Sequence, residues 1–162
     1  RRENWGEPMK NIFASVREVA EQNKDVQIIF PMHKNPLIRD LARESFKGIE
    51  DKVALIEPLE YVDFANLMNK CYLIMTDSGG IQEEAPALGK PVVVLRTETE
   101  RPEAVKAGTV KLAGVERNKI FEITNELVID DLEYHKMAHA INPYGDGKAC
   151  ERIVELIVKH FE

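Results

Sequence analysis

The sequence contains few of the features that stabilise secreted or membrane proteins. Only two cysteines, Cys71 and Cys150, occur among its 162 residues, too few for a disulfide framework or a cysteine-based metal motif. We expect two buried free thiols in a reducing cytosol. No apolar run approaches the length that spans a bilayer, and residues 1–6 do not resemble a signal peptide. A cytoplasmic protein with no membrane partner is expected.

Positive charge is also scarce. The chain has 22 Lys and Arg against 28 Asp and Glu, a net charge of −6, and no local basic cluster offsets this balance. Nucleic-acid-binding domains carry basic patches that neutralise phosphates. The composition therefore argues against nucleic acid as the main partner.

Several familiar site motifs are absent or incomplete. No ATP-type phosphate loop is present, and Ser78 lies in Asp-Ser-Gly-Gly rather than in the Gly-x-Ser-x-Gly elbow of serine hydrolases. His135 and His139 have the spacing of a helical zinc pair, but Lys136 stands where that motif has Glu. Asp146 has too few oxygen ligands near it for a calcium loop. We expect no metal and no redox cofactor.

Apolar runs and helical periodicity instead alternate along the chain. The length suits one domain, 1–162, and 44% apolar against 31% charged residues is typical of globular proteins. Buried strands are expected at 26–30, 53–56, 72–75 and 92–95, an edge strand at 109–113, and helices at 9–23, 36–46, 58–68, 81–88, 101–108, 120–128, 131–140 and 149–161. This order predicts an α/β fold with a doubly wound, mainly parallel, Rossmann-like sheet.

The stretch from Tyr72 to Leu95 is the most informative. Between its two strands, Ser78, Gly79 and Gly80 supply a hydroxyl and two backbone amides that no Cβ shields, in front of a helix N-terminus. This arrangement is typical of a seat for a phosphate or diphosphate. Glu84 follows one helical turn later, where it could accept hydrogen bonds from a ribose diol. A plain glycine turn with a solvated Glu84 is the alternative.

Other polar groups follow the ends of neighbouring strands. Ligands bind at the carboxyl edge of such sheets. Four segments should lie at this edge: the His33 loop, the Pro58–Phe64 loop, Asp77–Gly80 and the Arg96–Arg101 loop. Arg101 at a helix start needs an anion, either Glu98 or Glu100 or a ligand phosphate. His33 could bind a ligand oxygen or cap the next helix.

Seven motifs in this order resemble the carboxyl-terminal half of bacterial-type non-hydrolysing UDP-N-acetylglucosamine 2-epimerases, over almost the whole chain. They lie at residues 1–8 (RRENWGEP), 33–36 (HKNP), 77–86 (DSGGIQEEAP), 89–91 (GKP), 99–103 (TERPE), 107–109 (AGT) and 142–147 (NPYGDG).

The resemblance implies one half of the two-domain GT-B architecture, with the nucleotide sugar in the cleft between the domains. These cytoplasmic enzymes interconvert UDP-GlcNAc and UDP-ManNAc by elimination and re-addition of UDP, for cell-surface polysaccharide biosynthesis, and the full-length protein is expected to be a homodimer. The matching positions imply substrate contacts for Phe64 (uracil), Ser78, Gly79 and Gly80 (diphosphate), Glu84 (ribose) and Arg101 (diphosphate-sugar). Arg1 and His33 match contacts to an allosteric UDP-GlcNAc.

The resemblance also implies what this chain does not contain. The acidic residues that transfer protons lie in the amino-terminal domain, so we expect no catalytic residue here and no epimerase activity from these residues alone. The family has a His just before the position of Arg1, and some members carry Gln at the position of Leu59. Half of a GT-B glycosyltransferase, a hydrolysing epimerase and a non-catalytic nucleotide-sugar sensor remain alternatives.

Overall fold

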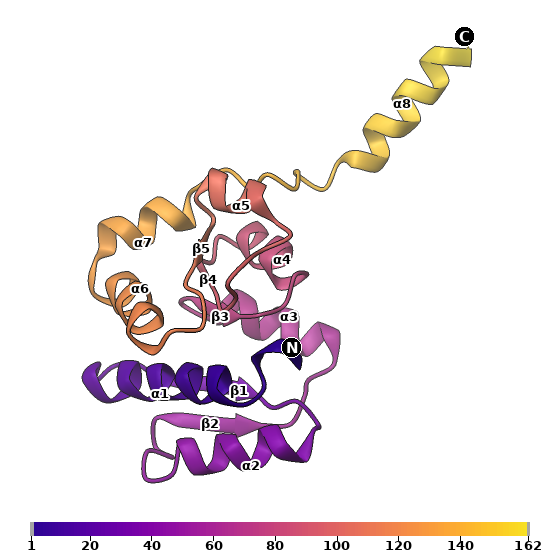
Figure 1. Cartoon of the computed structure of the whole chain (residues 1–162). Coiled ribbons are helices and arrows are strands. Elements are labelled where there is room, and N and C mark those ends of the chain that lie inside the picture. The colour runs from indigo at the N-terminus through magenta and orange to yellow at the C-terminus, as the bar shows by residue number, and fades with distance from the viewer. Residues whose placement is uncertain (1, 162) are drawn as a thin grey trace.

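The computed structural model describes residues 2–161 and consists of short parallel strands covered by helices (Figure 1). Its elements are η1 (Arg2–Asn4), α1 (Glu7–Gln22), β1 (Ile28–Pro31), α2 (Pro36–Ser45), β2 (Val53–Ile56), α3 (Tyr61–Lys70), β3 (Ile74–Thr76), α4 (Ile81–Ala87), β4 (Val92–Val94), α5 (Pro102–Ala107), β5 (Val110–Leu112), α6 (Arg117–Ile129), α7 (Asp131–Ala138) and α8 (Ala149–Phe161). The predicted α/β class and order of elements are confirmed.

All the described strands pair in parallel, as predicted, but they form two ladders. One ladder has the order β1-β2 and the other β3-β4-β5, and no ladder joins β1 to β3 within residues 2–161. β5 is an edge strand, as its alternating pattern indicated. Because a single apolar cluster includes Val53 of β2, Val93 of β4 and Ile120 of α6, the two ladders share one core.

Several strand boundaries differ from the predicted ones, and two of the differences have clear local reasons. Pro31 belongs to β1 instead of stopping it; Pro31 has no N–H to donate, and the N–H of Met32 continues the ladder to the carbonyl of Ile56 at 2.9 Å. β3 begins at Ile74 rather than Tyr72. The Tyr72 ring instead stacks on Tyr134 of α7, with ring centroids 3.9 Å apart.

Caps fix the helices that follow the site loops. Asn35 accepts a hydrogen bond from the N–H of Leu37 at 2.9 Å and Pro36 occupies the first turn of α2, as expected. Gly108 ends α5 with φ 80°, a left-handed conformation that favours glycine. The Asn35 cap follows the carboxyl end of β1, whereas Gly108 leads into the amino end of β5.

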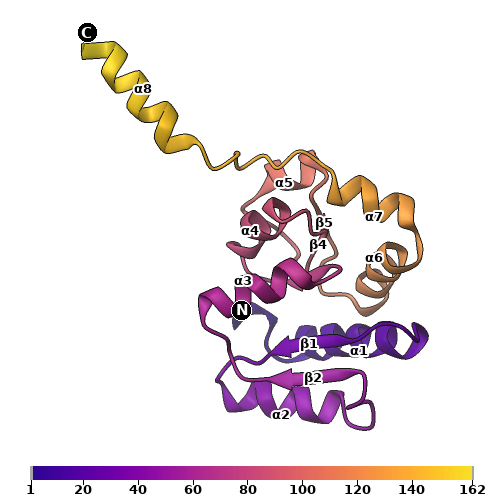
Figure 2. The same ribbon diagram turned by 180° about the vertical axis from the view of Figure 1, so that it is seen from behind.

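α8 projects from the rest of the protein beyond α5 and α7 (Figures 1 and 2). None of its described side chains is buried, and its apolar residues, including Leu156 and Phe161, are in solvent. The expectation of buried thiols is therefore wrong for Cys150, which lies on α8 and is exposed. Cys71 is half-buried, and both cysteines are free.

Candidate functional site

The predicted diphosphate turn lies between the end of β3 and the start of α4. The N–H of Ser78 donates to the Thr76 hydroxyl at 3.0 Å. In the described part of the chain, the amides of Gly79 and Gly80 donate to no protein acceptor. Gly80 has right-handed φ −62° and ψ −41°, so its missing side chain, rather than a special backbone angle, is what exposes the turn. Neither glycine amide is engaged by a described protein group; Gly80 is exposed, whereas Gly79 is buried.

Glu84 bends back over this turn. A Cβ added to Gly80 would lie 3.6 Å from Glu84 Oε1, so the carboxylate is close to Gly80. Its negative charge raises the pKa of Tyr61, and a hydrogen bond between the phenol and the carboxylate adds to that effect. Tyr61 begins α3, and the half-buried Phe64 lies one turn further on. Glu84 therefore connects the turn to the helix that bears the predicted uracil contact.

Arg101 lies beside the same turn, but its anion is not the predicted one. Its Nε forms a short hydrogen bond and ion pair with Glu83 of α4, and this bond raises the pKa of Arg101. Glu100 offers Arg101 a backbone carbonyl, at 3.1 Å from Nη1. The expectation of Glu98 or Glu100 as the protein's counter-ion is wrong, because Glu83 on the first turn of α4 lies closer than either loop carboxylate.

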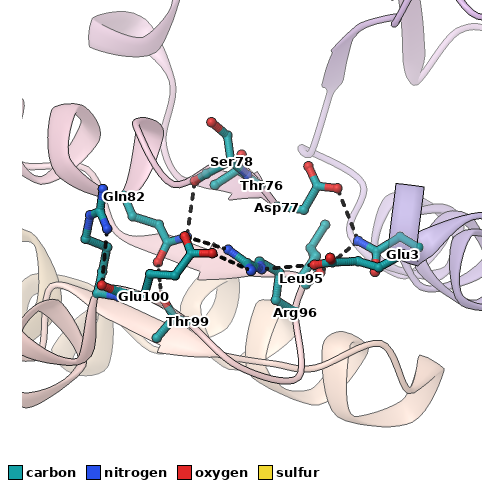
Figure 3. Close-up of polar contacts among 11 residues, drawn as sticks. Glu3, Thr76, Asp77, Ser78, Gln82, Leu95, Arg96, Thr99 and Glu100 are labelled. Atoms are coloured by element: carbon teal, nitrogen blue, oxygen red, sulfur yellow. Dashed lines mark hydrogen bonds and ion pairs between the residues drawn. The ribbon is translucent and has the colours of Figure 1, made fainter. Parts of the chain in front are cut away.

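A buried amide joins the Ser78 turn to the Arg101 loop. Gln82 is 0% exposed; its Nε2 donates to the Ser78 carbonyl at 3.1 Å and its Oε1 accepts from the Thr99 hydroxyl at 2.6 Å (Figure 3). The Thr99 hydroxyl in turn accepts from the N–H of Arg101 at 3.1 Å. Sequence reasoning did not single out Gln82, although a polar residue on the buried face of a predicted helix is a signal that could have indicated it.

Arg96 lies below the turn. The sequence indicated it only as the first residue of the Arg96–Arg101 loop. It is 8% exposed and contacts Glu100 through Nη1 at 3.4 Å and Nη2 at 3.2 Å, while its Nε lies 3.4 Å from Glu3 (Figure 3). The hydrogen bond to Glu100 raises the pKa of Arg96, although burial acts in the opposite direction. This buried cation holds together charges from η1 and the loop after β4.

The amino-terminal segment is fastened to the same edge. Asn4 Nδ2 donates to Asp77 Oδ2 at 3.1 Å and to the Leu95 carbonyl at 3.2 Å. Asn4 is buried, so it fixes the start of the chain against the ends of β3 and β4. Residue pairs this far apart in the sequence could not be predicted without the fold.

The His33 loop forms a separate part of the edge. His33 is exposed, and its Nδ1 accepts from the N–H of Asn35 at 3.1 Å. Arg39 donates to the His33 carbonyl at 3.2 Å and to both oxygens of Glu57 at 2.7 and 2.6 Å. The loops after β1 and β2 are thus tied together. Arg1, the other predicted allosteric contact, lies outside the described residues.

His139 and Asp146, which the sequence offered as possible metal ligands, contact protein groups close to them in sequence. His139 Nδ1 lies 2.8 Å from the His135 carbonyl, and Asp146 pairs with Arg152 at 2.6 Å and accepts from the N–H of Lys148 at 3.1 Å. Residues 2–161 contain no group of three His, Cys, Asp or Glu placed to hold a metal ion.

The described helices include none long and apolar enough to cross a membrane.

Two hollows on the described surface lie away from these groups. One is beside the start of α6 and is lined by residues that include Asn11 and Glu122, and the other borders β2 near Phe46 and Val53. The candidate site is accordingly an open rim of loops at the carboxyl ends of β3 and β4.

The chain is similar to known proteins over almost its whole length. The family model for UDP-N-acetylglucosamine 2-epimerase matches residues 1–158. A UDP-N-acetylglucosamine 2-epimerase of Bacillus subtilis is 53% identical over 161 residues, which cover 99% of this chain and 42% of that protein. One of Escherichia coli K12 is 48% identical over 157 residues, covering 97% of this chain and 42% of that protein.

Solved structures give the same likeness in three dimensions. The structure of Staphylococcus aureus MnaA with UDP superposes with a TM-score of 0.92 at 51% identity, covering 99% of this chain and 44% of that one. UDP-GlcNAc 2-epimerase from Neisseria meningitidis bound to UDP-GlcNAc gives 0.89 at 50% identity, covering 98% and 43%. The chain spans less than half the length of these relatives. Because the family model extends over nearly all of its residues, the chain belongs to the UDP-N-acetylglucosamine 2-epimerase family.

Proposed function

We propose that this chain is the carboxyl-terminal, UDP-binding half of a non-hydrolysing enzyme that interconverts UDP-GlcNAc and UDP-ManNAc. The observation that carries this is the Ser78-Gly79-Gly80 turn, whose two glycine amides donate to no described protein acceptor, with Glu84 beside Gly80 and Arg101 paired with Glu83 of the same helix. Relatives with about 50% identity have structures described with UDP and with UDP-GlcNAc. The half assignment rests on the resemblance of the seven sequence motifs to the carboxyl-terminal half of these enzymes.

Each group at the rim has a chemical role in this proposal. The Ser78 hydroxyl and the two glycine amides donate to the diphosphate oxygens, since backbone amides at a helix start suit phosphate groups. Arg101 leaves Glu83 and pairs with a phosphate oxygen, because charge-assisted contacts to phosphate are strong. Glu84 accepts from the ribose hydroxyls, and Phe64 lies against the uracil.

Firm retention of UDP is what the chemistry demands of this half. In the first step the C1–O bond of the sugar breaks, UDP leaves with the bonding electron pair, and a base removes the C2 proton. In the return step UDP attacks C1 of the glycal and a proton is added to the opposite face of C2. UDP is thus both leaving group and nucleophile, so its loss between the two steps would end the cycle. The proton transfers are assigned to residues outside this chain.

Binding of UDP to the chain tests the first part of the proposal. Isothermal titration calorimetry should give one site per chain, and binding should weaken for 2′,3′-dideoxy-UDP because Glu84 would lose its ribose partners. Equal affinity for the two ligands would contradict the role of Glu84. No binding of UDP by a folded chain would overturn the proposed function.

The activity itself is tested in the full-length protein. Incubation with UDP-GlcNAc should yield UDP-ManNAc with no free ManNAc. Release of free ManNAc and UDP would instead indicate the hydrolysing reaction, and sugar transfer only in the presence of an acceptor would indicate a glycosyltransferase. Binding without any product would indicate a sensor. Coding sequence upstream should specify a second α/β domain with the acid and base.

Three further expectations belong to the full-length protein and rest on the family resemblance. We propose a homodimer, a cytoplasmic location, and a second UDP-GlcNAc contact at Arg1 and His33. The exposed His33 ring, whose Nδ1 is engaged by Asn35, leaves Nε2 to donate to such a ligand. His33→Ala should leave UDP binding to the Ser78 turn unchanged and should reduce any activation by added UDP-GlcNAc.

A further inference from the structure

We propose that Gln82 is a positioning residue that sets the separation of the two halves of the diphosphate site, Ser78–Gly80 and Thr99–Arg101. The inference rests on the proposed function of those segments. Gln82 itself is fully buried, so it touches no ligand, and its effect must pass through Ser78 and Thr99.

The hydrogen bonds of Gln82 allow only one orientation of its amide. The Ser78 carbonyl can only accept, so the NH₂ group must face it, and the observed distance is 3.1 Å. The amide oxygen then faces Thr99, whose hydroxyl donates to it at 2.6 Å. With its proton so committed, the Thr99 hydroxyl presents a lone pair to the N–H of Arg101 at 3.1 Å. One side chain thereby orders donors and acceptors across both segments.

A second contact between the segments would not survive ligand binding. Glu83 holds Arg101 by an ion pair, and in the proposed complex Arg101 must leave Glu83 to reach a phosphate oxygen. Thr99, which donates to Gln82, accepts from the backbone N–H of Arg101 and not from its guanidinium. The Gln82–Thr99 and Thr99–Arg101 hydrogen bonds can therefore persist while the guanidinium moves. They keep Arg101 opposite Ser78 when the ligand is bound.

The variant Gln82→Glu tests this idea because the two side chains have the same shape. An ionised carboxylate cannot donate to the Ser78 carbonyl, and an unmade buried hydrogen bond is costly. A protonated carboxyl can both donate to Ser78 and accept from Thr99. Burial raises the pKa of a Glu, so the introduced group should gain its proton within an accessible pH range.

Gln82→Met is the matched control, since it fills similar volume and cannot form either bond at any pH. We expect Gln82→Met to raise the Kd for UDP about tenfold at every pH. Gln82→Glu should show a similar loss at about pH 9 and should return to within about threefold of the unsubstituted chain at about pH 5.5. Each Kd is compared with that of the unsubstituted chain at the same pH, which cancels the titration of UDP itself.

Two further measurements separate positioning from a simple loss of packing. Thr99→Val should weaken UDP binding as Gln82→Met does, and the double variant should be no weaker than either, because the two residues act as one unit. Hydrogen exchange without ligand should quicken at residues 78–80 and 99–101 in Gln82→Glu at high pH, with the core strand β4 still protected.

The outcomes distinguish this inference from the proposed function. If the unsubstituted chain binds UDP and Gln82→Glu binds it equally well at all pH values, the positioning role is overturned. A loss in Gln82→Glu that does not vary with pH, with additive losses in the double variant, also overturns it. Failure of the unsubstituted chain to bind UDP would remove the proposed function and the inference together.

Discussion

Arg96 and Glu100 form an ion pair that crosses the boundary between the core and solvent: Nη2 lies 3.2 Å from Oε1, with the guanidinium side chain 9% exposed and the carboxylate side chain 56% exposed. Glu3 lies 3.4 Å from Nε on another side of the guanidinium. The pair therefore keeps a buried cation neutralised by carboxylates that are themselves partly hydrated.

Arg96→Met should destabilise the fold by about 2 kcal/mol, less than a fully buried ion pair because Glu3 and Glu100 can hydrate once the cation is gone. Urea denaturation followed by circular dichroism measures the change. Arg152→Met is the matched control: Arg152 pairs with Asp146 in solvent, and its removal should change stability little. Equal effects of the two substitutions would contradict the account of Arg96.

Ser78→Ala should separate ligand binding from stability. The Ser78 hydroxyl makes no hydrogen bond to described protein groups, whereas the backbone of Ser78 is held by Thr76 and Gln82. We expect the free energy of unfolding to stay within about 0.5 kcal/mol and the Kd for UDP to rise on the order of tenfold. Calorimetry and thermal denaturation on the same sample check both. Unchanged affinity would remove Ser78 from the site.

Gly80→Ala should leave the fold intact and weaken nucleotide binding. Gly80 has a right-handed backbone and its added Cβ would meet only Glu84 at 3.6 Å, an ordinary contact distance. The methyl group would, however, cover the amides that face the diphosphate. UDP affinity should fall with no fall in melting temperature, since replacing Gly by Ala at a compatible angle restricts the unfolded chain.

Gly108→Ala is the counterpart of that experiment. Gly108 has φ 80° and open space around it, so the substitution forces a strained angle without filling any site. It should cost about 1 kcal/mol of stability and leave UDP affinity unchanged. If Gly80→Ala instead lowered stability and left UDP affinity unchanged, the Gly80 turn would have a structural role only.

Tyr144 should titrate unusually late in alkali. Burial, followed by the nearby charge of Glu103, raises the pKa of Tyr144 to about 12. The folded protein therefore keeps this proton after the unfolded chain has lost it, so the stabilisation is complete below about pH 10 and is lost as the pH rises toward the folded pKa. Phenolate absorbance in Tyr144→Phe should match that of the unsubstituted protein up to about pH 11. A smaller absorbance change in the variant below that pH would contradict the raised pKa.

The order of strands and helices was predictable because each depends on residues near in sequence. Solid apolar runs gave β2 and β4, and Asn35 with Pro36 marked the start of α2. The division of the strands into two ladders was not predictable, since it depends on backbone pairing between distant segments. Tyr72 shows the same limit: an apolar run suggested a strand, but its ring found a partner in Tyr134, 62 residues away.

The site residues also fall into those that the sequence predicted from local spacing and those that depend on the assembled fold. Ser78, Gly79, Gly80 and Glu84 lie within seven residues, so their placement on one turn followed from helix geometry. The partner of Arg101 was missed because Glu83 belongs to a different element. Arg96 and Asn4 were missed as participants because the burial of these polar groups becomes evident only when the surrounding elements are assembled, whereas Gln82 could have been indicated by its place on the buried face of a predicted helix.

The two hydrogen bonds of Asn4 have a practical consequence for handling the protein. Since this side chain is anchored to Asp77 and to the Leu95 carbonyl, a tag attached at the amino terminus of this chain would lie beside the proposed nucleotide site. Affinity tags and fluorescent reporters for binding assays are better attached beyond α8, which points away from that site (Figures 1 and 2).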